Sequence, residues 1–181
     1  MKPIIAASLC ALAATSVTSA AQTGAPPGCD GLEHRDDFDF WIGEWDVHAP
    51  DGTLAGTNSI RDTQNGCLIE EHWSGAQGSS GFSMNYYDPL TQAWRQIWMS
   101  ASVYIDYSGG LNDDGEMALE GEIFYHAQGN RYPFRGVWTP NADGSVTQHF
   151  TQYDAEGDTW NTWFTGTYVR RQADPNAHSG E

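Results

Sequence analysis

Lysine is nearly absent from this chain. Lys2 is the single example, and the other seven basic residues are arginines, which face 24 acidic residues and give a formal net charge of −16. So negative a protein repels nucleic acid and anionic lipid, and neither is an expected partner. An acidic ligand is not excluded, but it would have to meet one of the few arginines.

Long apolar runs are also missing. The apolar run at residues 4–14 is too short to cross a bilayer, and it follows the positive charge of Lys2. Small residues at 18–21 come next, as in the cleavage region of an export signal. We therefore expect residues 1–21 to be a signal peptide, and the protein to be periplasmic or secreted without a membrane anchor.

Cysteine is scarce as well. Cys10 lies in the expected signal, which leaves Cys29 and Cys67 as an even pair in an oxidising compartment. Cys29 belongs to a Pro/Gly-rich arm, and Cys67 opens an expected strand after Asn65 and Gly66. We expect a disulfide that ties the arm to the domain. The alternative, a reactive thiol pair, lacks C-x-x-C spacing and a neighbouring base.

No segment shows the periodicity of an amphipathic helix. From Trp41 onward, runs rich in β-branched and aromatic residues alternate with turns that contain Asp, Gly, Pro or Asn. Ten strands joined mostly by short hairpins form an up-and-down sheet, which avoids exposed edges best by closing into an antiparallel barrel. The expected strands span residues 41–49, 53–63, 67–74, 81–88, 93–101, 102–110, 116–126, 130–139, 145–153 and 159–170.

The expected organisation is one all-β domain with two short extensions. An arm at 22–37 follows the signal peptide, and it is where a short helix is expected, if there is one. The barrel covers residues 38–171, and the polar tail 172–181 is expected to be disordered.

Aromatic residues are concentrated where the first strand begins. Within residues 38–47, Trp41, Gly43, Trp45 and Val47 fall on one face of an extended strand. A glycine two residues before a tryptophan lets another chain segment approach closely, with the indole packed beside it. This stretch therefore predicts the closed floor of a small barrel.

The middle strands leave the direction of the cavity undecided, because both of their faces are amphipathic. A core would favour the face with Phe82 and Met84, and a ligand cavity the face with Ser83 and Asn85. Residues 67–74 are equally ambiguous, since one face carries Glu71 and the other carries Glu70 and His72. Either choice buries a carboxylate. Such a group is a candidate acid or base, or the counter-ion of an arginine, or it hydrogen-bonds a side chain of a neighbouring strand and stabilises the barrel.

Metal-binding patterns are weak. His48, His126 and His149 occur singly on expected strands, without H-x-H or H-E-x-x-H spacing. The acidic residues at 154, 156 and 158 alternate as in a calcium loop, but the later bidentate acid is missing. We expect no metal and no cofactor.

These segments together resemble the calycin barrels, which include lipocalins, fatty-acid-binding proteins and nitrobindins. In lipocalins, a G-x-W on the first strand is covered by a basic residue from the last strand. Gly43, Trp45 and Arg170 are the matching residues here. The resemblance implies that Arg170 stacks over Trp45 as a cation–π pair and closes the barrel.

The chain is more closely similar to a bacterial family of lipocalin-like domains of unknown function. The family pattern F-x-F-W-x-G-x-W-x-V matches residues 38–47, G-C-x-x-x-E matches 66–71, S-x-N-x-Y-D matches 83–88 and W-x-Q-x-W matches 94–98. Many relatives carry an aspartate where this chain has Ser100. The resemblance implies a fold more than a reaction. Calycin barrels bind small, mostly apolar molecules, and a minority are enzymes.

Three functions remain open beside a purely structural or envelope-interaction role, which a well-filled barrel without a void would indicate. The first is binding of a small apolar or aromatic molecule; its ligand-binding residues would be Glu71, Ser83, Asn85, Tyr87, Trp94, Gln96, Trp98, Gln148 and Phe150. The second is a cofactor-free isomerase, cyclase or hydrolase, with Glu71, His72 or Tyr87 as catalytic candidates. The third is nitrobindin-like haem binding, with His149 or His126 as axial ligand. The oligomeric state, monomer or homodimer, stays open.

Overall fold

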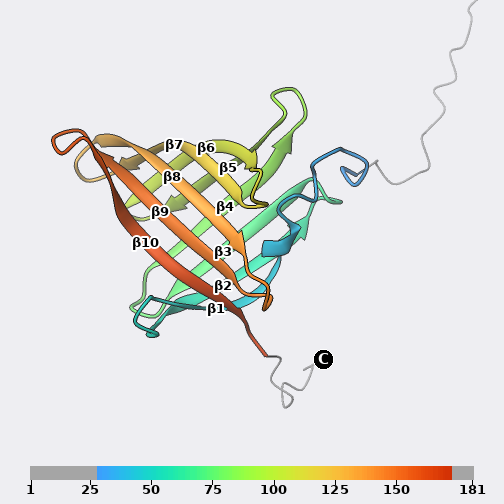
Figure 1. Ribbon diagram of the computed structural model, residues 1–181, viewed down its shortest axis with the longest axis horizontal. Coiled ribbons are helices and arrows are strands. Elements are labelled where there is room, and N and C mark those ends of the chain that lie inside the picture. The colour runs from blue at the N-terminus through green and yellow to red at the C-terminus, as the bar shows by residue number, and fades with distance from the viewer. Residues whose placement is uncertain (1–27, 173–181) are drawn as a thin grey trace, which may run out of the picture.

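The computed structural model describes residues 28–172 (Figure 1). The expected signal peptide, the first residues of the arm and all but the first residue of the expected tail lie outside this range. A short 3-10 helix, η1, covers Asp39–Trp41 and precedes the strands. The strands are β1 Gly43–His48, β2 Leu54–Thr63, β3 Leu68–Gly75, β4 Ser80–Asp88, β5 Ala93–Ser100, β6 Val103–Leu111, β7 Met117–Tyr125, β8 Asn130–Pro140, β9 Val146–Asp154 and β10 Thr159–Arg170. Within residues 28–172, no helix is long or apolar enough to cross a membrane.

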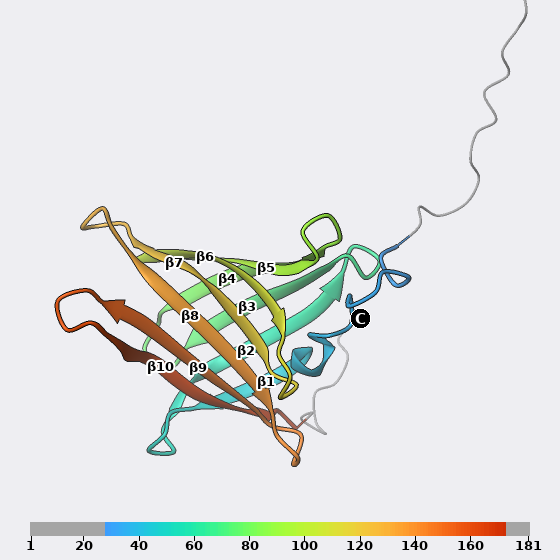
Figure 2. The same ribbon diagram turned by 45° about the horizontal axis from the view of Figure 1, so that its top comes forward.

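The ten strands form one closed antiparallel barrel, as the sequence predicts. Each strand pairs with the next along the chain, and β1 pairs with β10 to complete the circle. The connections therefore alternate between the two ends of the barrel. Figure 2 shows the arm at the end where β8 turns into β9, with the β9–β10 loop at the opposite end.

The expected strand bounds agree with the structure to within one or two residues, and the largest difference lies at Trp41. It was expected in the first strand, but it belongs to η1, where its backbone N–H donates to the Phe38 carbonyl at 3.1 Å. Gly43 then turns the chain into β1 at a φ of +151°, which a glycine adopts easily. Trp41 is still fully buried, because it packs against Phe38 and Trp138 at the closed end of the barrel.

The structure decides which strand faces point inward. On β4 and β5 the buried set includes Ser83, Asn85, Trp94 and Gln96, whereas Met84 on the other face is 41% exposed. On β3 the inward residue is Glu71 and not Glu70. The interior of the barrel therefore combines a large aromatic core with a band of buried polar groups.

The arm end of the barrel is closed by aromatic rings. Phe38 stacks on Trp41 at 4.9 Å between ring centroids and meets Trp138 edge-on at 5.2 Å. Trp45 donates its indole N–H to the Trp41 carbonyl at 2.8 Å. The head of the first strand therefore serves as the floor of the barrel.

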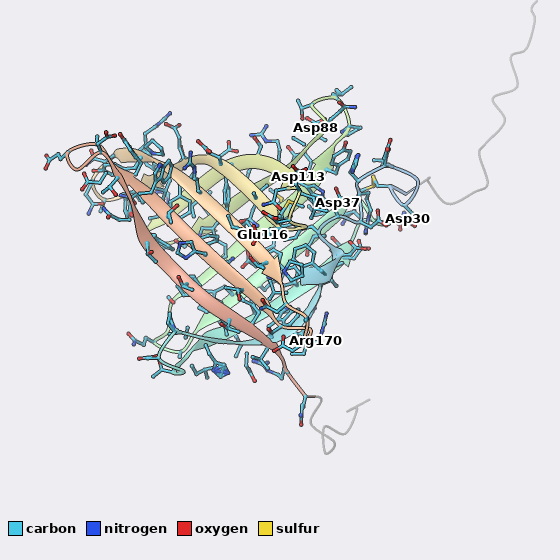
Figure 3. All side chains as sticks on the ribbon, viewed as in Figure 1. Asp30, Asp37, Asp88, Asp113, Glu116 and Arg170 are labelled. Carbon is cyan, nitrogen blue, oxygen red and sulfur yellow. A yellow bond between two sulfur atoms is a disulfide. The ribbon has the colours of Figure 1, made fainter. Side chains whose placement is uncertain are left out.

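Arg170 covers this floor from outside. Its guanidinium carbon lies 4.3 Å from the centre of the Trp45 ring, and its Nη1 donates to the Ile42 carbonyl at 3.1 Å. A side chain at Gly43 would overlap Nη1, so the glycine makes room for the arginine. Figure 3 shows Arg170 where β10 ends, at the same end of the barrel as Asp30, Asp37, Asp88 and Asp113.

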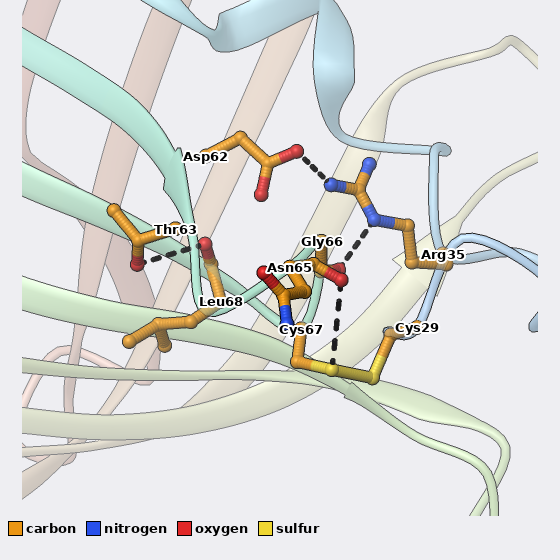
Figure 4. Close-up of a disulfide and its surroundings, with 8 residues drawn as sticks. All are labelled: Cys29, Arg35, Asp62, Thr63, Asn65, Gly66, Cys67 and Leu68. Carbon is orange, nitrogen blue, oxygen red and sulfur yellow. Dashed lines mark hydrogen bonds and ion pairs between the residues drawn. A yellow bond between two sulfur atoms is a disulfide. The ribbon is translucent and has the colours of Figure 1, made fainter. Parts of the chain in front are cut away.

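The predicted disulfide between Cys29 and Cys67 is present (Figure 4). It joins the arm to the β2–β3 turn. Arg35 reinforces this attachment, because its buried guanidinium donates to the Gly66 carbonyl, to Asp39 at 2.7 Å and to Asp62. The arm is thus held by a covalent bond and by ion pairs at one end of the barrel.

We expect Arg170→Ala to lower the free energy of unfolding by about 1 kcal/mol, because it removes the cation–π contact and a charged hydrogen bond at a partly solvated site. Urea denaturation measures this change. The matched control is Arg171→Ala, which removes only an exposed ion pair with Asp46 and should cost less than half as much. Equal losses in the two variants would contradict a closing role for Arg170.

We expect the double variant Cys29→Ser/Cys67→Ser to lose about 4 kcal/mol of stability, because the bond closes a loop with a sequence separation of 38. Guanidinium denaturation of the oxidised protein and of the variant provides the comparison. A loss below about 1 kcal/mol would mean that Arg35 and the aromatic floor hold the arm without the covalent bond.

Candidate ligand cavity

A cavity of about 260 Å³ opens in the half of the barrel that is farther from the arm. Its lining includes Trp73 near the end of β3, Ser79 in the β3–β4 loop and Trp98 near the end of β5. The arm contacts the opposite ends of these strands, since Arg35 bonds to Gly66 and the Trp94 indole donates to the His34 carbonyl at 2.9 Å. One end of the barrel is therefore closed, and the other holds the cavity.

The cavity walls are mainly aromatic. Besides Tyr107 and Tyr168, the rings that line it belong to Trp73, Trp98, Phe150, Trp163 and Phe164. Trp163 is 43% exposed, and it donates to the Tyr125 hydroxyl at 2.9 Å. It therefore lies at the mouth of the cavity.

Inward-facing glycines make space for these rings. A Cβ at Gly81 would overlap the Trp98 indole, and a Cβ at Gly56 would lie 2.6 Å from Trp73. Inside a small barrel, a large ring fits only where the neighbouring strand has no side chain. The position of the aromatic wall therefore depends on where the glycines occur in the adjacent strands.

The bottom of the cavity is polar and is called the polar floor here, distinct from the aromatic floor of the barrel. Its central residue is Glu71. Asn58 donates to its Oε1 at 2.7 Å, and Ser83 donates to its Oε2 at 2.6 Å. Asn58 also donates to the Tyr168 hydroxyl at 3.2 Å, and that hydroxyl donates to Gln148 at 2.9 Å. One arm of the network thus runs from Glu71 to β10 and β9.

A second arm of the network runs across β4, β5 and β6. Tyr107 donates to the Gln96 carbonyl oxygen, and the Gln96 amide donates to Asn85. Asn85 donates to the Ser83 hydroxyl at 2.9 Å, and Ser83 in turn donates to Glu71. Along this second arm each donor points toward the carboxylate, whereas along the first arm only Asn58 donates to it and the Tyr168 hydroxyl donates away from it, to Gln148.

Burial raises the pKa of Glu71 to about 7, and the hydrogen bonds from Ser83 and Asn58 offset only part of this effect. The pKa values of Tyr107 and Tyr168 lie well above their ordinary value, because both hydroxyls are buried and lie near the Glu71 charge. Near neutral pH the tyrosines are therefore protonated, and the pKa of Glu71 lies close to the pH.

Of the ligand-binding residues expected from the sequence, Glu71, Gln96, Trp98, Gln148 and Phe150 line the cavity. Ser83 and Asn85 are buried behind it and position Glu71 and Gln96 through hydrogen bonds.

Tyr87 and Trp94 lie elsewhere, at the closed end. Tyr87 packs against His34 at 6.0 Å between ring centroids, and Trp94 meets Phe38 edge-on at 5.7 Å. They share the inward parity of the site residues but lie under the arm. The alternation of side chains along a strand therefore shows which residues point inward, but not whether they lie at the closed end or in the cavity.

The histidine candidates face outward. His72 packs on Phe82, and its side chain is 55% exposed beside Glu70. His149 contacts Thr165 on the outer surface, and His126 lies by Tyr104 and Phe124.

No histidine of the described residues lines the cavity, so the donor set that they form does not fit an axial haem ligand. Among residues 28–172, no group of three His, Cys, Asp or Glu side chains is placed to hold a metal ion.

Several residues of the site were not expected from the sequence. Asn58, Tyr107 and Tyr168 hold the polar floor, and Trp73 and Trp163 form the wall. Trp73 lies two residues after Glu71 and Tyr168 two residues before Arg170, so the alternation of side chains along a strand could have indicated both. Trp163 gave no such signal, because a register shift between Thr162 and Phe164 changes its direction.

No model of a known protein family matches the chain, and no curated protein matches it either. The closed ten-stranded barrel itself fits a calycin or lipocalin-like fold. Membership of the bacterial family with the F-x-F-W-x-G-x-W pattern stays a prediction.

We expect Glu71→Gln to change how stability depends on pH. The pKa of Glu71 is higher in the folded protein than its ordinary value of 4.5, so folding takes up a proton between about pH 4.5 and 7. The wild-type free energy of unfolding should therefore fall by about 3 kcal/mol relative to the variant as pH rises through that range. Chemical denaturation at pH 4.5 and 8 tests this. Parallel pH profiles would mean that Glu71 is not a buried titrating group.

Proposed function

We propose that this chain is an exported, lipocalin-like binding protein that holds a small, largely aromatic molecule inside its barrel. The observation that carries the proposal is the cavity itself, in which aromatic walls face a polar floor of Glu71, Gln96 and Gln148. Burying about 150 Å² of a ligand's apolar surface contributes roughly 4 kcal/mol. The polar floor would then orient the polar end of the molecule.

The disulfide supports the exported location, because such bonds persist in oxidising compartments. The interior supports recognition rather than architecture alone. An apolar core is sufficient to stabilise a barrel, whereas burying a carboxylate costs free energy. A role in ligand recognition would account for keeping such a group inside.

We expect the neutral probe N-phenyl-1-naphthylamine to bind with an increase in its fluorescence. Trp98→Ala should weaken binding by at least about tenfold, because Trp98 forms part of the wall. The matched control is Trp160→Ala, since Trp160 packs under Arg135 on the outer surface, 3.8 Å from the guanidinium carbon. The control should stay within about twofold of the wild type. Equal weakening in both variants, or no fluorescence change with the wild type, would contradict the proposal.

A second candidate is a cofactor-free enzyme. It is favoured by the pKa of Glu71 of about 7, because a general base works best when its pKa lies near the operating pH. The tyrosines limit this candidate, because the hydroxyl protons of Tyr107 and Tyr168 are already donated to Gln96 and Gln148. These two hydroxyls therefore do not offer their protons as the acid partner of a base in this site. The test is isomerisation of 3-cyclohexenone to its conjugated isomer, followed by ultraviolet absorbance. Equal rates for the wild type and Glu71→Gln would remove this candidate.

A further inference from the structure

Among residues 28–172, Glu71 is the only charged side chain that lines the cavity. None of the lining residues is an arginine, a lysine or a histidine. Arg170 and Arg35 are both engaged at the closed end, over Trp45 and with Asp39 and Asp62. The negative charge in the cavity therefore has no cation of the protein to balance it.

The hydrogen bonds of Glu71 leave acceptor capacity free. The carboxylate receives one bond from Asn58 and one from Ser83, both from neutral donors. Two carboxylate oxygens can accept about four hydrogen bonds. Tyr107 and Tyr168 line the same cavity but donate their protons to Gln96 and Gln148 instead. A further donor to Glu71 can thus come from a ligand.

The aromatic walls favour a positive charge over a negative one. The π faces of Trp73, Trp98 and Trp163 are electron-rich, and a cation near such a ring is stabilised, most strongly where water is excluded. An anionic ligand would meet these faces and the Glu71 charge without any compensating cation. The cavity chemistry therefore selects by charge as well as by shape.

The loops around the mouth of the cavity carry negative charge, as Glu71 does inside it. The loops at the open end lie at residues 49–53, 76–79, 101–102, 126–129 and 155–158, and they contain neither arginine nor lysine. Asp51, Glu156 and Asp158 lie in these loops, on a chain with a net charge of −16. Such a field raises the local concentration of cations and speeds their encounter with the site.

We infer that the ligand is a small organic cation: a protonated amine carried on an aromatic or apolar body, with the amine against Glu71 and the body between the aromatic rings. This inference rests on the proposed binding function and names its ligand class. The amine supplies the charge and the donors that the cavity lacks, and the rings supply the apolar surface.

The linkage to pH follows from the same geometry. Burial raises the pKa of Glu71 to about 7, and an ammonium group beside the carboxylate would favour its ionised form. Tyr107 and Tyr168 are the other titratable groups that face Glu71, and both stay protonated through this range. If the ligand binds only the ionised form of Glu71, its apparent affinity should rise about tenfold from pH 6 to pH 8, because the ionised fraction rises by that factor.

The test is isothermal titration calorimetry of the disulfide-bonded protein with three molecules of one shape. At pH 8 we expect 2-phenylethylamine to bind at least tenfold more tightly than neutral 2-phenylethanol, and phenylacetate to bind most weakly. Between pH 6 and 8 the amine should gain about tenfold and the alcohol less than twofold. This pH series uses the wild type alone, so it does not depend on whether a variant folds.

Glu71→Gln should remove the tenfold advantage of the amine over the alcohol. The matched control is Glu70→Gln, on the outer face of the same strand, which should change neither affinity. An equal affinity for amine and alcohol in the wild type, or an amine advantage that survives in Glu71→Gln, would overturn the inference while leaving the binding function intact. If neither phenyl compound nor N-phenyl-1-naphthylamine binds, the proposed function itself fails.

Discussion

Closure of the sheet between β1 and β10 is the constraint on which the rest of this molecule depends. Trp45 lies opposite Arg170 in that pairing, and the arginine folds back over the indole in the space left by Gly43. Once each strand has two neighbours, the backbone has no free edge and the interior is sheltered from water. Polar groups inside then pair mainly with one another, as those around Glu71 do.

The interior is divided between two tasks. Near the arm, Phe38, Trp41 and Trp138 fill the barrel, and the disulfide holds the arm in place. Beyond them a polar band crosses the barrel, and above it the walls are aromatic around open space. Burying the Glu71 carboxylate lowers the stability of the barrel, and the fold does not need a carboxylate at this position. This supports a role for Glu71 in ligand recognition.

Local patterns were sufficient for the strands, because alternation and turn residues act over a few positions. They failed at Trp41, where the backbone turns into a 3-10 helix before Gly43 resets its direction. They also could not choose between Glu70 and Glu71, since a shift of one residue moves a strand's whole set of side chains to the other face. Tyr87 and Trp94 point inward as well, but the arm covers them.

By itself, the sequence determined an all-β barrel of ten strands, the disulfide partners and the aromatic floor. Each of these depends on nearby residues, or on a pair with few alternatives. The tertiary structure decided which carboxylate is buried, and it brought Asn58 and Ser83 from neighbouring strands to bond with it. It also set Tyr168, from the far end of the chain, beside Asn58. Such contacts arise from register around a closed circle, which no local pattern contains.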